Sequence, residues 1–190
     1  NNMQKYINLT LIISIIMLGC LYLFAYVPKF DPNDRDLDIF VGYDNIVSLF
    51  GVINMTVFCV LSSVIYTKFV VEEYMGKRVI LLFSYPINRE KIFCSKIMIV
   101  SLFTISAMTF CNLIVFGIFG LTEMISPIVN DHITFQIIIK MLKTTIFMSI
   151  SAAGLSIIAM GIGFLQKSIA STIISAFLLS SLLCNVVAGT

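Results

Sequence analysis

Uncharged apolar runs of helical length dominate the chain. Five of them contain no Asp, Glu, Lys, Arg or His: 6–28, 45–67, 97–122, 144–166 and 168–190. A transmembrane helix needs roughly 20 apolar residues, at about 1.5 Å per residue, to cross about 30 Å of hydrocarbon. The pattern therefore predicts an all-α integral membrane protein. We expect one transmembrane domain over residues 1–190, with five transmembrane helices at about 6–28, 45–68, 94–122, 142–166 and 168–188.

Composition supports this class. Of 190 residues, 59% are hydrophobic and 12% charged, whereas a soluble domain carries roughly 25% charged residues. A soluble fold of this size could not bury so much apolar surface, so membrane lipid is the expected surrounding. The net charge of +2 is too small to indicate nucleic acid as a partner.

The charged residues predict the orientation. If the N-terminus is cytoplasmic, eight of the twelve basic residues lie inside: Lys5, Lys68, Lys77, Arg78, Arg89, Lys91, Lys96 and Lys167. The positive-inside rule favours this topology. We expect the protein to lie in the cell membrane with this orientation. This topology gives a cytoplasmic segment at 70–93 and outer loops at 29–44 and 123–141. Within the second loop, the apolar residues before Lys143 form either an interfacial helix or the start of a long tilted span.

Both ends of the sequence lead to expectations about the complete protein. Five spans from a cytoplasmic N-terminus place the C-terminus outside, and the chain begins at Asn1 rather than methionine. We expect further residues at both ends, including a sixth span.

The polar residues inside the runs indicate helix packing. Because ion-driven carriers usually keep ionisable groups at membrane depth, the uncharged runs disfavour a proton-driven carrier. No catalytic or metal-ligating set is recognisable, so the chain is not expected to be an enzyme or to hold a metal. Amides and small residues let helices hydrogen-bond and approach closely. Candidates for packing, a dimer face or a conduit are Asn54, Asn112, Gly154, Gly161, Gly163 and Ser175.

The cytoplasmic segment between the second and third runs holds the most specific pattern. Its uncharged core, Val79 to Asn88, is too short to span a bilayer. Pro86 breaks a helix at the preceding residue. Asn88 can cap the next helix, with Glu90 in the first turn where the helix dipole favours an acid. The segment therefore predicts a helix–turn–helix elbow in the cytoplasm.

This segment resembles the first cytoplasmic loop of ABC-2 type permeases, the membrane subunits of a class of ATP-binding-cassette exporters. The resemblance covers residues 70–96, and the hydropathy of the chain fits the family's six-span half-transporter, of the type V exporter kind. Lys77 stands where threonine is common and Asn88 where serine is frequent. The matching residues are Glu72, Glu73, Tyr74, Gly76, Leu81, Leu82, Pro86, Arg89, Ile92 and Lys96, and the short inner turn from Phe164 to Ser168 is also similar.

The resemblance implies a coupling helix that sits in a groove of a separate cytosolic ABC ATPase subunit. The implied coupling residues are Glu72, Glu73, Tyr74, Tyr85, Pro86, Ile87, Asn88, Arg89, Glu90 and Lys91. The chain has no Gly-x-x-x-x-Gly-Lys-Ser/Thr phosphate loop. No cofactor is therefore expected in this chain, and ATP with Mg would bind the ATPase partner. An ordinary amphipathic loop at the interface is the competing interpretation.

We therefore predict the permease subunit of an ATP-driven ABC exporter, acting as a homodimer in a bacterial plasma membrane. Its cargo would be a hydrophobic or amphipathic solute, with a peptide toxin or antimicrobial peptide favoured because an uncharged conduit suits apolar cargo. The alternatives are an ATP-independent carrier or channel, and a membrane scaffold.

Overall fold

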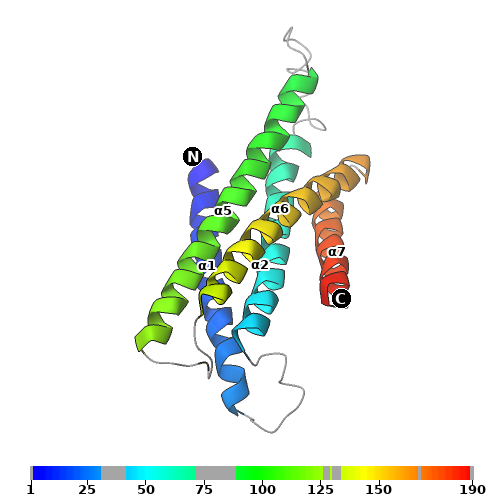
Figure 1. The fold of residues 1–190 in the computed structure, drawn as a ribbon. Coiled ribbons are helices and arrows are strands. Elements are labelled where there is room, and N and C mark those ends of the chain that lie inside the picture. Colours follow the sequence, from blue (N-terminus) through cyan, green and yellow to red (C-terminus); the bar gives the residue numbers. More distant parts are fainter. Residues whose placement is uncertain are drawn as a thin grey trace. The chain divides into compact units, whose positions relative to one another are not determined.

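The computed structural model describes residues 2–30, 42–71, 89–125, 129, 134–166 and 168–188. These residues contain helices and no strand, which confirms the predicted all-α membrane fold. The helices are α1 (Asn2–Phe30), α2 (Tyr43–Tyr66) with the π-helical turn η2 (Thr67–Val71), α5 (Arg89–Ile125), α6 (Phe135–Gln166) and α7 (Ile169–Ala188) (Figure 1).

Four of these helices are long and apolar enough to cross a membrane. Their spanning segments are Gln4–Val27, Tyr43–Val70, Glu90–Ile125 and Phe135–Gln166. In α7 the apolar stretch is shorter, Ile169–Cys184. The whole of α7 has 20 residues, which at about 1.5 Å per residue reach about 30 Å.

The helices α5 and α6 continue into the range predicted as an outer loop, 123–141. The structure shows α5 as helix to Ile125 and α6 as helix from Phe135, so parts of the predicted outer loop are helical, and its limits at the membrane stay a prediction. Glu123 and Lys143 bound the uncharged runs on either side of this range. Charges mark where hydrocarbon ends, but a helix satisfies its own backbone hydrogen bonds in either medium. Since α6 is one continuous helix, residues 135–141 begin a long helix rather than a separate interfacial one.

Local residues explain where two helices begin. Gly42, directly before α2, has a φ of 87°, a left-handed conformation that glycine adopts without steric cost. Its carbonyl accepts the Ile46 N–H at 3.2 Å. At the start of α6, the Thr134 carbonyl accepts the Ile137 N–H at 2.9 Å, as expected for a threonine at the N-cap.

The described helices form two compact units. The first unit comprises 1–54 and 107–148, and the second comprises 55–106 and 149–190. Aromatic side chains join α1, α2 and α5 within the first unit. The Phe119 ring lies edge-on to Tyr22, with centroids 5.6 Å apart, and to Tyr43 at 6.4 Å. The Tyr22 hydroxyl is 2.6 Å from Thr122 Oγ1, so the polar end of this ring is satisfied.

Small residues form the core of the second unit. Cys59, Ala159 and Ala176 are fully buried, with Leu155 and Leu179 packed against them. Small side chains allow α2, α6 and α7 to approach closely, which is how helices associate without a hydrophobic driving force in lipid.

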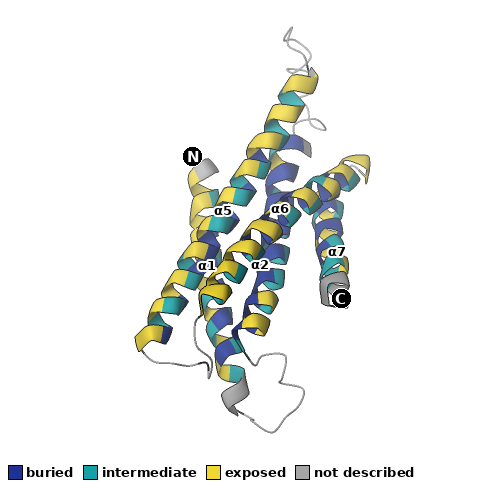
Figure 2. Ribbon diagram, viewed as in Figure 1, coloured by how far each residue is buried: buried dark blue, intermediate teal, exposed yellow. Residues whose placement is uncertain are grey.

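The outer faces of the helices are apolar. In α1, for example, Ile15 is 71% exposed and Leu23 65%, and Figure 2 shows long exposed faces on α1 and α5. Such faces are unfavourable in water and natural in hydrocarbon. By contrast, 61% of the spanning window of α2 is buried against 22% in α1, so α2 is the more deeply buried of these two helices.

Candidate functional site

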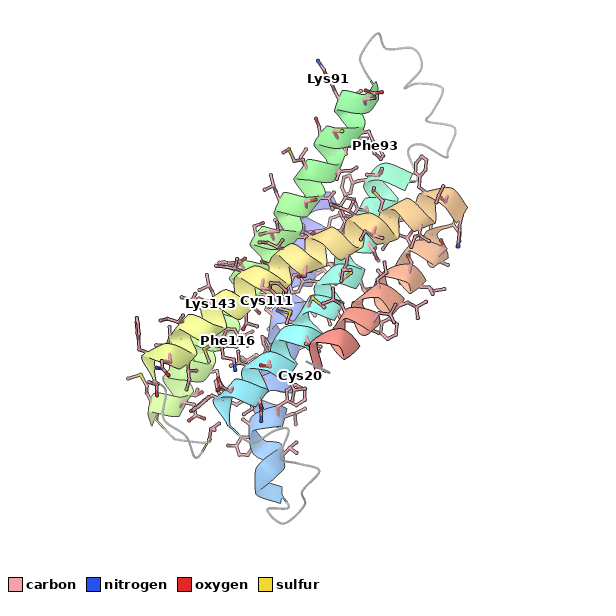
Figure 3. The ribbon with its side chains drawn as sticks, turned by 45° about the vertical axis from the view of Figure 1, so that its right-hand side comes forward. Cys20, Lys91, Phe93, Cys111, Phe116 and Lys143 are labelled. Atoms are coloured by element: carbon pink, nitrogen blue, oxygen red, sulfur yellow. The ribbon has the colours of Figure 1, made fainter. Side chains whose placement is uncertain are left out.

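The candidate site is the end of the second unit where α5 begins. Arg89, Glu90 and Lys91 form the first turn of α5. The helix thus starts directly after Asn88, the predicted cap, and the Glu90 and Lys91 side chains are exposed. Figure 3 shows Lys91 pointing away from the helices. The other predicted coupling residues lie outside the described residues: Glu72, Glu73, Tyr74, Tyr85, Pro86, Ile87 and Asn88.

One turn further along, Phe93 joins the start of α5 to the end of α6. Its ring meets Phe164 edge-on, with centroids 6.4 Å apart and an interplanar angle of 69°. Such a pair contributes about 0.5–1.5 kcal/mol beyond its buried area. A force on the first turns of α5 would therefore reach the α6–α7 turn through this contact.

Tyr66 connects the end of α2 to the same part of α5. This side chain is fully buried. Its hydroxyl donates to the Ile97 carbonyl at 3.1 Å and lies 2.6 Å from Ser101 Oγ. Directly after it, α2 widens into η2, which contacts α7. Single π-helical turns are frequent at functional sites, and this one leads into the predicted coupling segment.

A buried chain of hydroxyls links α2, α5 and α6 deeper in the second unit. Thr104 Oγ1 donates to Ser62 Oγ at 2.8 Å, Ser62 donates to Ser156 Oγ at 3.0 Å, and Ser156 donates to the Ala153 carbonyl at 2.8 Å. In a membrane each such bond contributes about 1 kcal/mol or less. Their main effect is to fix the register of the three helices.

The helices α6 and α7 form a tight hairpin. A Cβ atom added at Gly163 would lie 2.8 Å from Thr172 Cβ and 3.2 Å from Thr172 Cα, so only glycine fits. Ser168 N–H donates to the Gly163 carbonyl at 3.3 Å. On the next turns, Ser175 Oγ lies 3.4 Å from the Ala159 carbonyl. Because of these contacts, α6 and α7 are expected to move together as a rigid hairpin.

The structure brings Asn54 and Asn112 together in the first unit. Asn54 Nδ2 donates to Asn112 Oδ1 at 2.6 Å, and Asn112 Nδ2 donates to Thr145 Oγ1 at 3.3 Å. The Thr145 hydroxyl donates to the Met141 carbonyl at 2.8 Å. The network joins α2, α5 and α6, and Asn54 Oδ1 is buried there without a hydrogen-bond partner.

Gly154 and Gly161 lie elsewhere. Both are exposed on α6, and a Cβ atom at either would meet no atom within 4 Å. The described contacts do not need these glycines, so a dimer or conduit role for them stays a prediction.

The first unit contains a cavity that the sequence did not predict. It measures about 670 Å³ and lies between α5 and α6, with Leu113, Phe116 and Leu142 in its walls and Asn112 and Thr145 also lining it. Gly117 and Gly120 leave room for it. The three-residue spacing of these glycines is the sequence feature that could have indicated the cavity. It does not distinguish a cavity from close helix packing.

These features define a multi-pass helical membrane protein with a charged helix start at one end. Within the part of the chain that the structure describes, no group of three or more His, Cys, Asp or Glu could hold a metal ion.

The chain matches the ABC-2 family transporter proteins over residues 3–182 and belongs to that family. It is therefore a membrane permease subunit of an ABC transporter, a type of subunit that works with an ATPase subunit. It is similar to the uncharacterized protein YcbO of Bacillus subtilis (strain 168), with 27% identity over 187 residues that cover 98% of this chain and 80% of YcbO. No solved structure matches.

Proposed function

We propose that this permease exports a hydrophobic or amphipathic solute, with an amphipathic peptide as the favoured cargo. It would act as a homodimer in the plasma membrane with its N-terminus in the cytoplasm, and the Bacillus relative is consistent with a bacterial source. Two cytosolic ATPase subunits would bind ATP and Mg and supply the energy. The predicted coupling helix is the contact between permease and ATPase.

The start of α5 supports this proposal most strongly. Exposed charges in its first turn are followed by Phe93, which contacts Phe164, and by the Tyr66 hydroxyl bond to the Ile97 carbonyl. A displacement of the first turn would therefore move α2 and the α6–α7 hairpin together with α5. Rigid elements that shift between two arrangements are how such closing motions are transmitted.

The apolar character of the spans supports the cargo class. The five uncharged runs contain no Asp, Glu, Lys, Arg or His, so they offer no ionic site for a small charged substrate. The acidic residues of the predicted outer loop 29–44 would attract a cationic peptide at the surface.

Charge reversal at the start of α5 tests the coupling assignment. The complete protein and its ATPase are co-purified and reconstituted in lipid, with Arg89→Glu or Lys91→Glu. We expect loss of the complex, or a fall of at least about tenfold in cargo-stimulated ATP hydrolysis, because like charges placed together at an interface cost several kcal/mol.

Lys5→Glu is the matched control. Lys5 is also exposed and lies on the same predicted side of the membrane, but on α1 and outside the coupling segment. If the α5 variants assemble and hydrolyse ATP like Lys5→Glu, the coupling helix is only an interfacial loop. Cargo transport without the ATPase would instead establish a carrier or channel.

A further inference from the structure

The cavity between α5 and α6 of the first unit runs along α5 towards the α5–α6 connection. Its walls extend from Thr109 to Met124 on α5, which is about 22 Å at 1.5 Å per residue. Thr109 is near the middle of the uncharged run 97–122, and Met124 follows its end. One leaflet of a bilayer is about 15 Å of hydrocarbon. The cavity therefore extends from the middle of the membrane to one interface.

The cavity opens sideways into the hydrocarbon. Leu113, Leu142 and Ile146 line it and are 58%, 52% and 58% exposed. Its volume of about 670 Å³ is within the usual range of small-molecule sites, about 300–1,000 Å³. A ligand could enter from the lipid without passing through water.

The polar groups in the wall are already used within the protein. Asn112 accepts from Asn54 and donates to Thr145, whose hydroxyl donates to the Met141 carbonyl. A peptide in hydrocarbon needs partners for its backbone N–H and C=O groups, and these side chains have little capacity left for them. An acyl chain needs only dispersion contacts. The wall therefore favours lipid over peptide.

The cationic side chain of Lys143 lies near the cavity, in the N-terminal half of α6. Lys143 directly follows the lining residue Leu142 and is exposed (Figure 3). Within the described ranges no carboxylate lies at ion-pair distance from it, whereas Lys140 pairs with Asp44 at 2.8 Å. A lysine at this depth extends its ammonium group towards the head groups. Lys143 can thus meet a lipid phosphate.

We infer that this cavity binds one acyl chain of an anionic phospholipid from the leaflet that contains the α5–α6 connection, with the lipid phosphate at Lys143. This site would make the permease sensitive to anionic lipid whether or not the cargo assignment holds.

The inference is tested by native mass spectrometry of the complete protein after delipidation and titration with palmitoyl-oleoyl-phosphatidylglycerol. We expect the wild type to retain one lipid per chain. Gly120→Phe should reduce retention at least about tenfold, because the new ring fills the cavity, and a Cβ atom at Gly120 meets nothing within 4 Å. Lys143→Gln should weaken phosphatidylglycerol about fivefold and leave phosphatidylcholine unchanged.

Gly19→Phe is the control for the glycine substitution. Gly19 is exposed on α1, also has no atom within 4 Å of an added Cβ, and does not line the cavity. Gly117→Leu fills the cavity from a second position if Gly120→Phe does not fold. Equal lipid retention by the filled and control variants would overturn the site. Binding of an amphipathic peptide instead of lipid, or a changed oligomeric state on filling, would overturn the choice of occupant.

Discussion

Replacement of Gly163 by alanine tests the close approach of α6 and α7. The added Cβ atom would lie 2.8 Å from Thr172 Cβ and 3.2 Å from Thr172 Cα, and Thr172 is fully buried. Relief therefore requires α7 to move as a whole, because the obstacle includes its backbone. Overpacking of this kind costs about 1–3 kcal/mol. The higher helix propensity of alanine offsets up to about 1 kcal/mol of this overpacking cost.

Gly161→Ala is the matched control. Gly161 lies two residues earlier on the same helix and meets nothing within 4 Å of an added Cβ. It should gain the same helix preference without the clash. The two variants should therefore differ by about 1–3 kcal/mol, and the apparent melting temperature of Gly163→Ala should be lower by about 2–10 °C.

The assay is thermal unfolding of a fluorescent fusion in detergent, followed by size-exclusion chromatography. The double variant Gly163→Ala/Thr172→Gly moves the missing Cβ to the other helix. It should recover at least about 1 kcal/mol relative to the sum of the single changes, since contacting residues are coupled. Equal melting temperatures for Gly163→Ala and Gly161→Ala would refute the close approach of the hairpin.

Three further predictions follow from single contacts. Asn112→Leu should destabilise the chain by about 1–2 kcal/mol, because it removes the acceptor of the buried Asn54 amide. Asn54→Leu should cost less, because Asn112 still donates to Thr145. Unfolding in mixed micelles measures both, and the reverse order would contradict the network. Cys94, the exposed cysteine among the five, should react with a membrane-impermeant maleimide in inverted vesicles and not in intact cells; labelling of intact cells would invert the predicted orientation. Asp44→Asn should change the free energy of unfolding by less than about 1 kcal/mol, because the pair with Lys140 is exposed on both sides; a larger loss would show that the pair is shielded from water.

The sequence was sufficient to predict the spans but not the helix ends. Long uncharged runs can only be helices in a bilayer, since each backbone group must be satisfied within its own segment. The helices α5 and α6 extend beyond the uncharged runs 97–122 and 144–166, because Glu123 and Lys143 indicate contact with water rather than a break in hydrogen bonding. The start of α5 was predictable because Asn88 and Glu90 form a specific pattern at a helix N-terminus.

Which polar or small residue meets which partner was only partly predictable. Asn54 and Asn112 are conspicuous in apolar runs, because a buried amide needs a partner, whereas Thr145 is one of many hydroxyls. Gly161 and Gly163 look equivalent in sequence, yet one is exposed and the other meets Thr172. A helix that is apolar all round carries no periodicity to show which face is buried, so only the packing distinguishes them.

The hydrogen bonds between α2 and α5 contribute too little free energy to determine which transport state is populated. Asn54, Ser62 and Tyr66 of α2 form hydrogen bonds with α5, in addition to the ring contact between Tyr43 and Phe119. Asn54 donates to Asn112, Ser62 accepts from Thr104, and Tyr66 donates to the Ile97 carbonyl. Hydrogen bonds between membrane helices average about 0.6 kcal/mol, so together they contribute about 2 kcal/mol. Inverting a two-state equilibrium from 1:99 to 99:1 takes about 5.5 kcal/mol. These bonds therefore set the register of α2 against α5 but are too weak to hold either transport state. In the proposed mechanism, the difference comes from packing, as in the α6–α7 hairpin, and from an ATPase subunit that binds one arrangement of the α5 start more tightly than the other.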